Sequence, residues 1–138
     1  MTHLLDTSAV LAHVRDEPGA GLVQDLFERE GVSVFLCSVT LAELARRLRD
    51  LGATPEEAWE TIEGYRQAVE GVVPVDEAVA RESDRILIST PARLPLVDAL
   101  IAAAASSRGA VLVHRDAHMR SIPASQVRQL YLESTPAR

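Results

Sequence analysis

Four acidic residues occupy positions where carboxylates could act together. They are Asp6, Glu43, Asp98 and Asp116. Asp6 follows the short apolar run 3–5, and Asp116 follows the apolar run 110–114. In an open α/β sheet, ligands bind outside the carboxyl ends of the strands, so acids that follow parallel strands can meet there. Carboxylates that converge repel one another, and an oxygen-only cluster suits hard divalent cations such as Mg²⁺ or Mn²⁺, which commonly serve phosphoryl chemistry.

Each of these acids also has a structural explanation. Asp6 can cap the helix after it, because Asp accepts hydrogen bonds from the free N–H groups of a helix start. Thr40 and Glu43 have the spacing of a capping box, and Asp98 falls in the first turn of a helix, where the dipole favours an acid. An ionised Asp98 among apolar neighbours nevertheless needs a partner. Four separate capping roles explain the pattern less well than one shared site.

The elements that must position these acids alternate along the chain. Apolar or alternating runs predict strands at 3–5, 32–37, 72–75, 110–114 and, as an edge strand, 127–132. Helical spacing predicts helices near 9–14, 22–30, 38–52, 54–69, 76–88 and 96–107, with a short helix near 117–120. This alternation implies a parallel sheet covered by helices on both faces. We expect residues 134–138 to be loosely held.

Composition sets the broad class. A chain of 138 residues and 15.0 kDa, 47% hydrophobic, fits a single domain over 1–138. The formal net charge is −6 and all 14 basic residues are arginine. A generic nucleic-acid binder is usually basic, so any nucleic acid would need local arginines or metal ions to offset repulsion.

The single cysteine, Cys37, excludes an internal disulfide, and we expect it to be buried. No apolar run is long enough to span a bilayer, so we expect a cytoplasmic protein without membrane contact.

Four ordered segments carry a family resemblance. They are Leu4–Ser8, Ser38–Leu44, Leu96–Ala105 and Val111–Met119. Together they resemble the PIN-domain nucleases, most closely the VapC-type toxins of bacterial toxin–antitoxin pairs, over essentially the whole chain. The resemblance implies an α/β fold with three α/β/α layers, in which helices flank a five-stranded parallel sheet. It also implies a metal-dependent endoribonuclease that uses Mg²⁺ or Mn²⁺, with Asp6, Glu43, Asp98 and Asp116 as the catalytic and metal-binding acids. The implied partners are an RNA substrate, a cognate VapB-like antitoxin and a second copy in a homodimer, with the groove between the helices before Gly52 as the antitoxin seat.

Some residues beside the four acids support or modify this expectation. Ser8 matches a hydroxyl position of the first motif, and Arg115 is a candidate for stabilising the leaving oxygen. The last motif usually opens with Thr or Ser, whereas this chain has His114, so a hydroxyl contact is missing or replaced. His118 stands where some relatives carry another acid. Two histidines without a nearby cysteine give only a weak zinc signal, and the simpler interpretation of His114 is a strand-end residue with a backbone partner.

Other functions are compatible with the same fold. The main alternative is a PIN-fold RNA-binding or interaction module with weak or no catalysis, which His114 favours and the presence of all four acids opposes. Receiver-type phosphoacceptor domains and Asp-x-Asp phosphatases both rely on a lysine, and this chain has none. The phosphatase motif also requires an acid at the position of Ser8.

Overall fold

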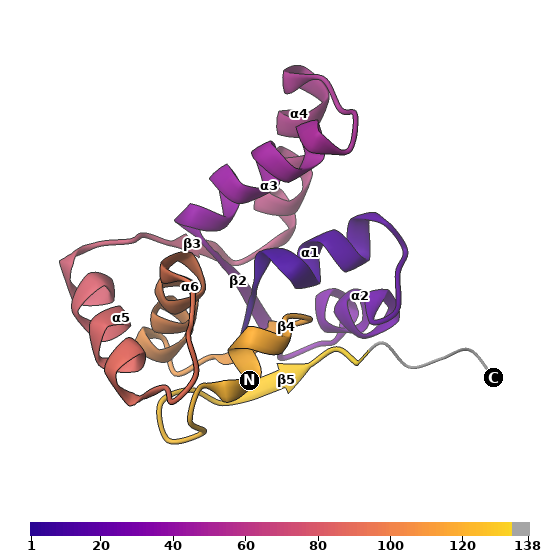
Figure 1. Ribbon diagram of the computed structural model, residues 1–138. Coiled ribbons are helices and arrows are strands. Elements are labelled where there is room, and N and C mark those ends of the chain that lie inside the picture. Colours follow the sequence, from indigo (N-terminus) through magenta and orange to yellow (C-terminus); the bar gives the residue numbers. More distant parts are fainter. Residues whose placement is uncertain (134–138) are drawn as a thin grey trace.

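Strands and helices alternate along residues 1–133, the part of the chain that the computed structural model describes (Figure 1). The strands are β1 (Thr2–Leu5), β2 (Ser33–Cys37), β3 (Gly71–Val73), β4 (Val111–His114) and β5 (Gln129–Tyr131). The α-helices are α1 (Thr7–Val14), α2 (Ala20–Glu28), α3 (Ser38–Asp50), α4 (Pro55–Ala68), α5 (Glu77–Ser89) and α6 (Leu96–Ser107), and a 3₁₀ helix, η1, spans Ala117–Ser121. These elements confirm the predicted order; β1 begins one residue earlier than expected, and the other four strands are slightly shorter. The expectation for 134–138 lies outside the described residues.

The five strands form one sheet in the order β3-β2-β1-β4-β5, and every neighbouring pair is parallel. This confirms the predicted parallel sheet and the edge position of β5. The chain leaves β1 toward β2 on one side, whereas β4 pairs with β1 on the other. The order therefore reverses between β1 and β4, and such a switch point opens a crevice outside the carboxyl ends of the strands.

Helices cover both faces of the sheet, because successive side chains of a strand point to opposite faces. Leu4 packs with residues of α5 and α6, whereas Leu5 packs with residues of α1, α2 and α3. Both leucines are fully buried, and the same alternation separates Leu112 from Val113 on β4. This arrangement is the predicted three-layer α/β/α fold of the PIN type. It explains why β1 and β4 are apolar on both faces.

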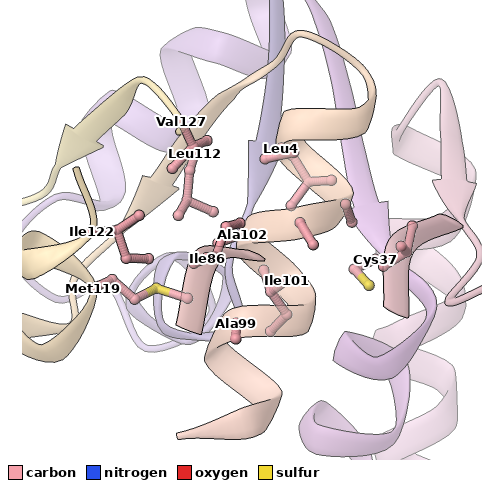
Figure 2. Packing of buried hydrophobic residues seen from close by; sticks show 14 of the residues in the cluster. Leu4, Cys37, Ile86, Ala99, Ile101, Ala102, Leu112, Met119, Ile122 and Val127 are labelled. Carbon is pink, nitrogen blue, oxygen red and sulfur yellow. The ribbon is translucent and has the colours of Figure 1, made fainter. Parts of the chain in front are cut away.

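Helix α6 lies against the sheet through alanines (Figure 2). Ala99 and 102–105 are fully buried, beside Leu4 of β1 and Leu112 of β4. Small side chains let the helix approach the strands closely. The start of α6, with Asp98 in its first turn, is thereby fixed relative to the carboxyl ends of the strands.

Helices α3 and α4 form a hairpin that projects from the sheet (Figure 1). Thr54 caps α4 in a full capping box with Glu57, with Pro55 in the first turn. Trp59 on α4 is 49% exposed, so it is not a core residue. No helix within residues 1–133 has both the length and the apolar character needed to cross a membrane.

Candidate active site

A cavity of about 390 Å³ lies at the carboxyl ends of the strands, where the order of the sheet reverses. Its lining includes all four predicted acids, Asp6, Glu43, Asp98 and Asp116. They come from the β1–α1 turn, α3, α6 and the β4–η1 turn. The remaining lining residues are Thr7, Ser8, Leu11, Arg15, Glu17, Arg47 and Arg115. The fold therefore brings together four acids that are separated by up to 110 positions in the sequence.

Asp6 sits at the floor of the cavity and is only 3% exposed. Its carboxylate accepts two hydrogen bonds from Ser8, one from the backbone N–H at 2.9 Å and one from the hydroxyl at 2.5 Å. Asp6 therefore does cap α1, but its capping bonds leave it inside the cavity. The Ser8 hydroxyl oxygen also accepts the backbone N–H of Arg115 at 2.8 Å. Ser8 thus joins the turn after β1 to the turn after β4.

Glu43 lines the cavity from the second turn of α3, which follows β2 directly. Its Oε1 accepts a 2.5 Å hydrogen bond from the hydroxyl of Thr7, which lies 3.3 Å from the hydroxyl of buried Thr40. The capping-box interpretation of Thr40 and Glu43 is wrong. Helix α3 follows β2 without a loop and begins at Ser38, so Thr40 lies within the first turn and Cys37 occupies the N-cap position.

Asp98 and Asp116 form the second half of the site together with His118. Each of the three offers a ligand atom, and these atoms all lie within 4.8 Å of one another. Asp116 Oδ1 caps η1 by accepting the backbone N–H of His118 at 2.9 Å, and it also lies 3.0 Å from His118 Nδ1. The two carboxyls are half-buried, whereas His118 is exposed. This half of the site is therefore open to solvent.

His114, at the end of β4, is fully buried and supports Asp116. Its Nδ1 accepts the backbone N–H of Asp116 at 3.2 Å, and its Nε2 lies 2.7 Å from Gln129 Oε1 on β5. An acceptor Nδ1 requires the proton on Nε2, where it can be donated to Gln129. Burial lowers the pKa of His114, which favours this neutral form. His114 is thus a strand-end residue with a backbone partner, as expected.

Burial and mutual repulsion raise the pKa of two of the acids. The pKa of Asp6 rises to about 6, mainly because of burial, and the charges of Glu43 and Asp116 add to this effect. The pKa of Asp98 rises to about 7, again first through burial and then through the charge of Asp116. Carboxylates in such a cluster favour a bound cation or a shared proton.

Arginines surround the acidic floor of the cavity. Arg115 donates to Glu17 Oε1 at 3.1 Å, and Arg15 lies 3.5 Å from Glu17 Oε2. Arg47 lies one turn beyond Glu43 on α3 and forms no ion pair with any of residues 1–133. Within the same residues, no arginine is paired with any of the four acids. The cavity thus combines an acidic floor with a basic rim.

Sequence reasoning missed several residues of the cavity. Thr7 could have been identified, because a hydroxyl next to a strand-end acid is well placed to orient a second acid. Arg47 could also have been identified, because positions four apart on a helix share a face and Glu43 precedes it by four. Glu17 lies in the turn between α1 and α2, and no local signal marks it.

The sequence profile of the PIN domain matches residues 3–124. The chain belongs to the PIN domain family. A comparison with curated proteins found no match. The expected family and fold are therefore confirmed, over a span that includes all four acids and His118.

Solved structures give the same fold. A DNA-bound VapBC structure from Salmonella typhimurium aligns with a TM-score of 0.76 and 23% identity, covering 96% of this chain and 98% of that chain. VapBC2 from Rickettsia felis, bound to a promoter DNA fragment, aligns with a TM-score of 0.75 and 17% identity, covering 96% of this chain and 100% of that chain. VapBC-5 from Mycobacterium tuberculosis, a member of the VapBC family of toxin–antitoxin systems, aligns with a TM-score of 0.65 and 25% identity. The alignment covers 94% of this chain and 98% of that chain.

Proposed function

We propose that this chain is a metal-dependent endoribonuclease, the toxin of a toxin–antitoxin pair, which hydrolyses phosphodiester bonds in RNA. Asp6, Glu43, Asp98 and Asp116 are its catalytic and metal-binding acids. The observation that carries the proposal is the convergence of these four carboxyls in one cavity of a PIN fold, with no arginine of residues 1–133 paired to them. Unneutralised carboxylates at this density favour a divalent cation.

The donor set fits Mg²⁺ or Mn²⁺. Asp98 and Asp116 face one another closely enough to bind one ion, and both are partly open to solvent, which leaves room for water ligands. When bound, a divalent ion supplies Lewis-acid polarisation of the phosphate and activation of water. Ser8 and Thr7 hold Asp6 and Glu43 in fixed orientations through their hydroxyls, so these two carboxylates meet the substrate without rearrangement.

The basic rim suits an anionic polymer. Arg47 has no ion-pair partner within residues 1–133, so its guanidinium can bind a backbone phosphate beside the acidic floor. Arg115 remains our candidate for stabilising the leaving oxygen. Its contact with Glu17 holds its guanidinium at the cavity. Contacts of this kind allow an acidic protein to bind RNA locally despite its net charge of −6.

The assembly we propose follows the structural relatives. The three similar structures described above are of VapBC2, VapBC and VapBC-5, and the last is a member of the VapBC family of toxin–antitoxin systems. We extend this to a VapB-like antitoxin that sits on the helices before Gly52, and to a homodimer of single-domain chains in the cytoplasm. Leu51 and Trp59, at the exposed end of the α3–α4 hairpin, offer apolar contact surface to a partner.

A cleavage assay tests the activity. Labelled RNA is incubated with the full-length chain in Mg²⁺, in Mn²⁺ or in chelator, beside Asp116→Asn and the matched surface variant Asp84→Asn on α5. We expect cleavage with either ion, none in chelator, none with Asp116→Asn and wild-type cleavage with Asp84→Asn. Binding of RNA without cleavage under every condition would favour the alternative, an inactive interaction module. His114 no longer argues for that alternative, because its ring supplies a contact to Asp116.

A further inference from the structure

We propose that His118 binds the divalent ion through Nδ1, beside Asp98 and Asp116, so that the site selects Mn²⁺ over Mg²⁺. This rests on the proposed function in that it takes a divalent ion as the ligand of the cavity. It goes beyond that function in two respects. It adds a nitrogen ligand to the metal site, and it predicts a preference between Mg²⁺ and Mn²⁺, which the four acids alone do not provide.

The first observation is the composition of the compact group. Asp98, Asp116 and His118 bring ligand atoms within 4.8 Å of one another, and neither Asp6 nor Glu43 belongs to this group. Asp6 and Glu43 are instead bonded to hydroxyls of Ser8 and Thr7. The ligand atoms that one ion can reach together are therefore two carboxylate oxygens and one imidazole nitrogen.

The second observation is the position of the ring. Nδ1 of His118 lies 3.0 Å from Asp116 Oδ1. Two ligands on adjacent corners of an octahedral ion, each about 2.1 Å from it, lie about 3.0 Å apart. The backbone N–H of His118 holds the same Oδ1 at 2.9 Å, which fixes the carboxylate relative to the ring. Nδ1 and Oδ1 are therefore close enough to bind one ion together.

The third observation is how the other imidazoles are placed. His3 on β1 is buried and its Nδ1 has no hydrogen-bond partner within residues 1–133, but it does not line the cavity. Both nitrogens of His114 have partners, Gln129 and the backbone of Asp116. Both nitrogens of His13 also have partners, Tyr65 and Gln24, on neighbouring helices. His118 instead projects from η1 with 65% of its side chain exposed and Nδ1 directed at a carboxylate of the cavity. Its Nδ1 can therefore reach an ion bound in the cavity.

The chemistry of the donors sets the preference. Mg²⁺ favours oxygen ligands and gives up its water reluctantly, whereas imidazole suits the transition metals. Mn²⁺ accepts carboxylate and water oxygens as Mg²⁺ does, but as the first member of the divalent transition-metal series it takes a nitrogen ligand more readily than the strongly hydrated Mg²⁺. A site with two carboxylates and one imidazole should therefore bind Mn²⁺ more tightly than Mg²⁺.

Calorimetric titration of the full-length chain with Mn²⁺ and with Mg²⁺ tests the selectivity. Loss of even an outer-shell partner commonly costs about 10–100-fold in metal affinity, so His118→Ala should lose at least about tenfold for Mn²⁺. The Mg²⁺ affinity should change little. His118→Asp should restore an oxygen ligand and bring the two affinities closer together. His13→Gln is the matched control, because it removes an imidazole outside the cavity and should leave both affinities unchanged.

Pulsed electron paramagnetic resonance of the Mn²⁺-loaded chain tests direct ligation independently of activity. We expect a ¹⁴N coupling in the wild type and in His13→Gln, and its loss in His118→Ala. Equal losses of Mn²⁺ and Mg²⁺ affinity, without a ¹⁴N coupling in the wild type, would overturn the inference and make His118 a positioning residue for Asp116. Wild-type binding by His118→Ala together with lost binding by Asp98→Asn would overturn the inference alone. Unchanged Mn²⁺ binding by Asp98→Asn would contradict the proposed metal site itself.

Discussion

The two halves of the cavity hold their acids in different ways. Asp6 and Glu43 receive strong hydrogen bonds from the hydroxyls of Ser8 and Thr7, so the chain itself satisfies them. Asp98 and Asp116 face each other, and Asp116 also contacts His118 Nδ1. The first half is therefore pre-organised by the fold, whereas the second half depends on a cation or on protons. Substitutions in the two halves should consequently have different effects on cleavage, Mn²⁺ affinity and thermal stability.

Asp98→Asn should have the largest effect, because it removes a ligand of the open half. We expect cleavage to fall by more than the roughly 10–100-fold that outer-shell changes cause, and Mn²⁺ stabilisation to weaken. Without metal, the variant should be more stable than the wild type, because a like charge is removed. Two charges about 4 Å apart repel by about 4 kcal/mol at an effective dielectric near 20, and even about 1 kcal/mol raises Tm by about 4 °C. Thermal melts in chelator and in Mn²⁺, beside one cleavage assay, measure these effects.

A different result is expected if Asp98 only stabilises the start of α6 through the helix dipole. In that case Asp98→Asn would leave both cleavage and the Mn²⁺-dependent rise in Tm unchanged. Asp50→Asn at the end of α3 is a suitable control for the loss of one surface acid.

Thr7→Val should have the next largest effect and should affect the other half. Val keeps the shape of the side chain but removes the hydrogen bond to Glu43. A hydrogen bond to a charged group contributes about 1.5–3 kcal/mol, which corresponds to a loss of roughly tenfold or more in kcat/KM. Mn²⁺ affinity should fall less than in Asp98→Asn, because Glu43 remains present and the ligands of the open half are untouched. Thr61→Val on α4, whose exposed hydroxyl bonds only to the Glu57 carbonyl, is the matched control. A large loss of Mn²⁺ affinity in Thr7→Val would contradict the division into halves.

Arg47→Ala should have a smaller effect, on substrate binding. RNA affinity is measured with Asp98→Asn as the inactive background, over a range of salt concentrations. Loss of one phosphate contact should weaken binding severalfold at low salt and reduce the slope of log Kd against log salt by about 0.7 for a single strand. Arg49→Ala, on the same helix but outside the cavity, should leave the slope unchanged. Equal effects of the two substitutions would show a general charge effect and no specific contact.

The smallest expected effect is a dependence of stability on pH in chelator. The pKa values of Asp6 and Asp98 are raised in the folded state, so the folded protein keeps protons that the unfolded chain releases above pH 3.8. Stability should therefore fall as pH rises from about 4 to about 7 and level off above that, because the unfolded state binds fewer protons in this window. A change of roughly 1 kcal/mol corresponds to a few degrees in Tm.

The same measurement separates the two halves. Asp98→Asn should remove the part of the slope that extends to pH 7 and leave the part that ends near pH 6, which belongs to Asp6. Identical slopes for the variant and the wild type would contradict the raised pKa of Asp98.

The sequence predicted the order of elements well, because the strands are continuous apolar runs and the helices carry clear start signals. Thr54-Pro55 marks the start of α4, and Asp76 marks that of α5, where its carboxylate accepts the N–H of Val79. The four acids could be identified because each follows a strand or opens a helix. Their common location depends only on the parallel topology.

The contacts between the acids and their neighbours could not be predicted. Glu43 had a local explanation in Thr40, three positions earlier, but its actual partner is Thr7, which lies 36 positions away. Likewise, the partner that completes the hydrogen bonding of His114 is Gln129, on a strand that pairs with β4 only in the folded sheet. Local sequence patterns report neighbours within a turn or two, and side-chain partners across the sheet follow from the three-dimensional arrangement.

The strand order has a consequence for synthesis on the ribosome. Strand β1 is made first and lies at the centre of the sheet, yet one of its two neighbours, β4, is made among the last described residues. His3 of β1 can pair with Val111 of β4 only after Val111 has been translated, and Asp116 is translated later still. A nascent chain can therefore form β1, β2 and β3 with their helices long before the fourth acid emerges. The cavity therefore stays incomplete until the segment that follows β4 has been translated.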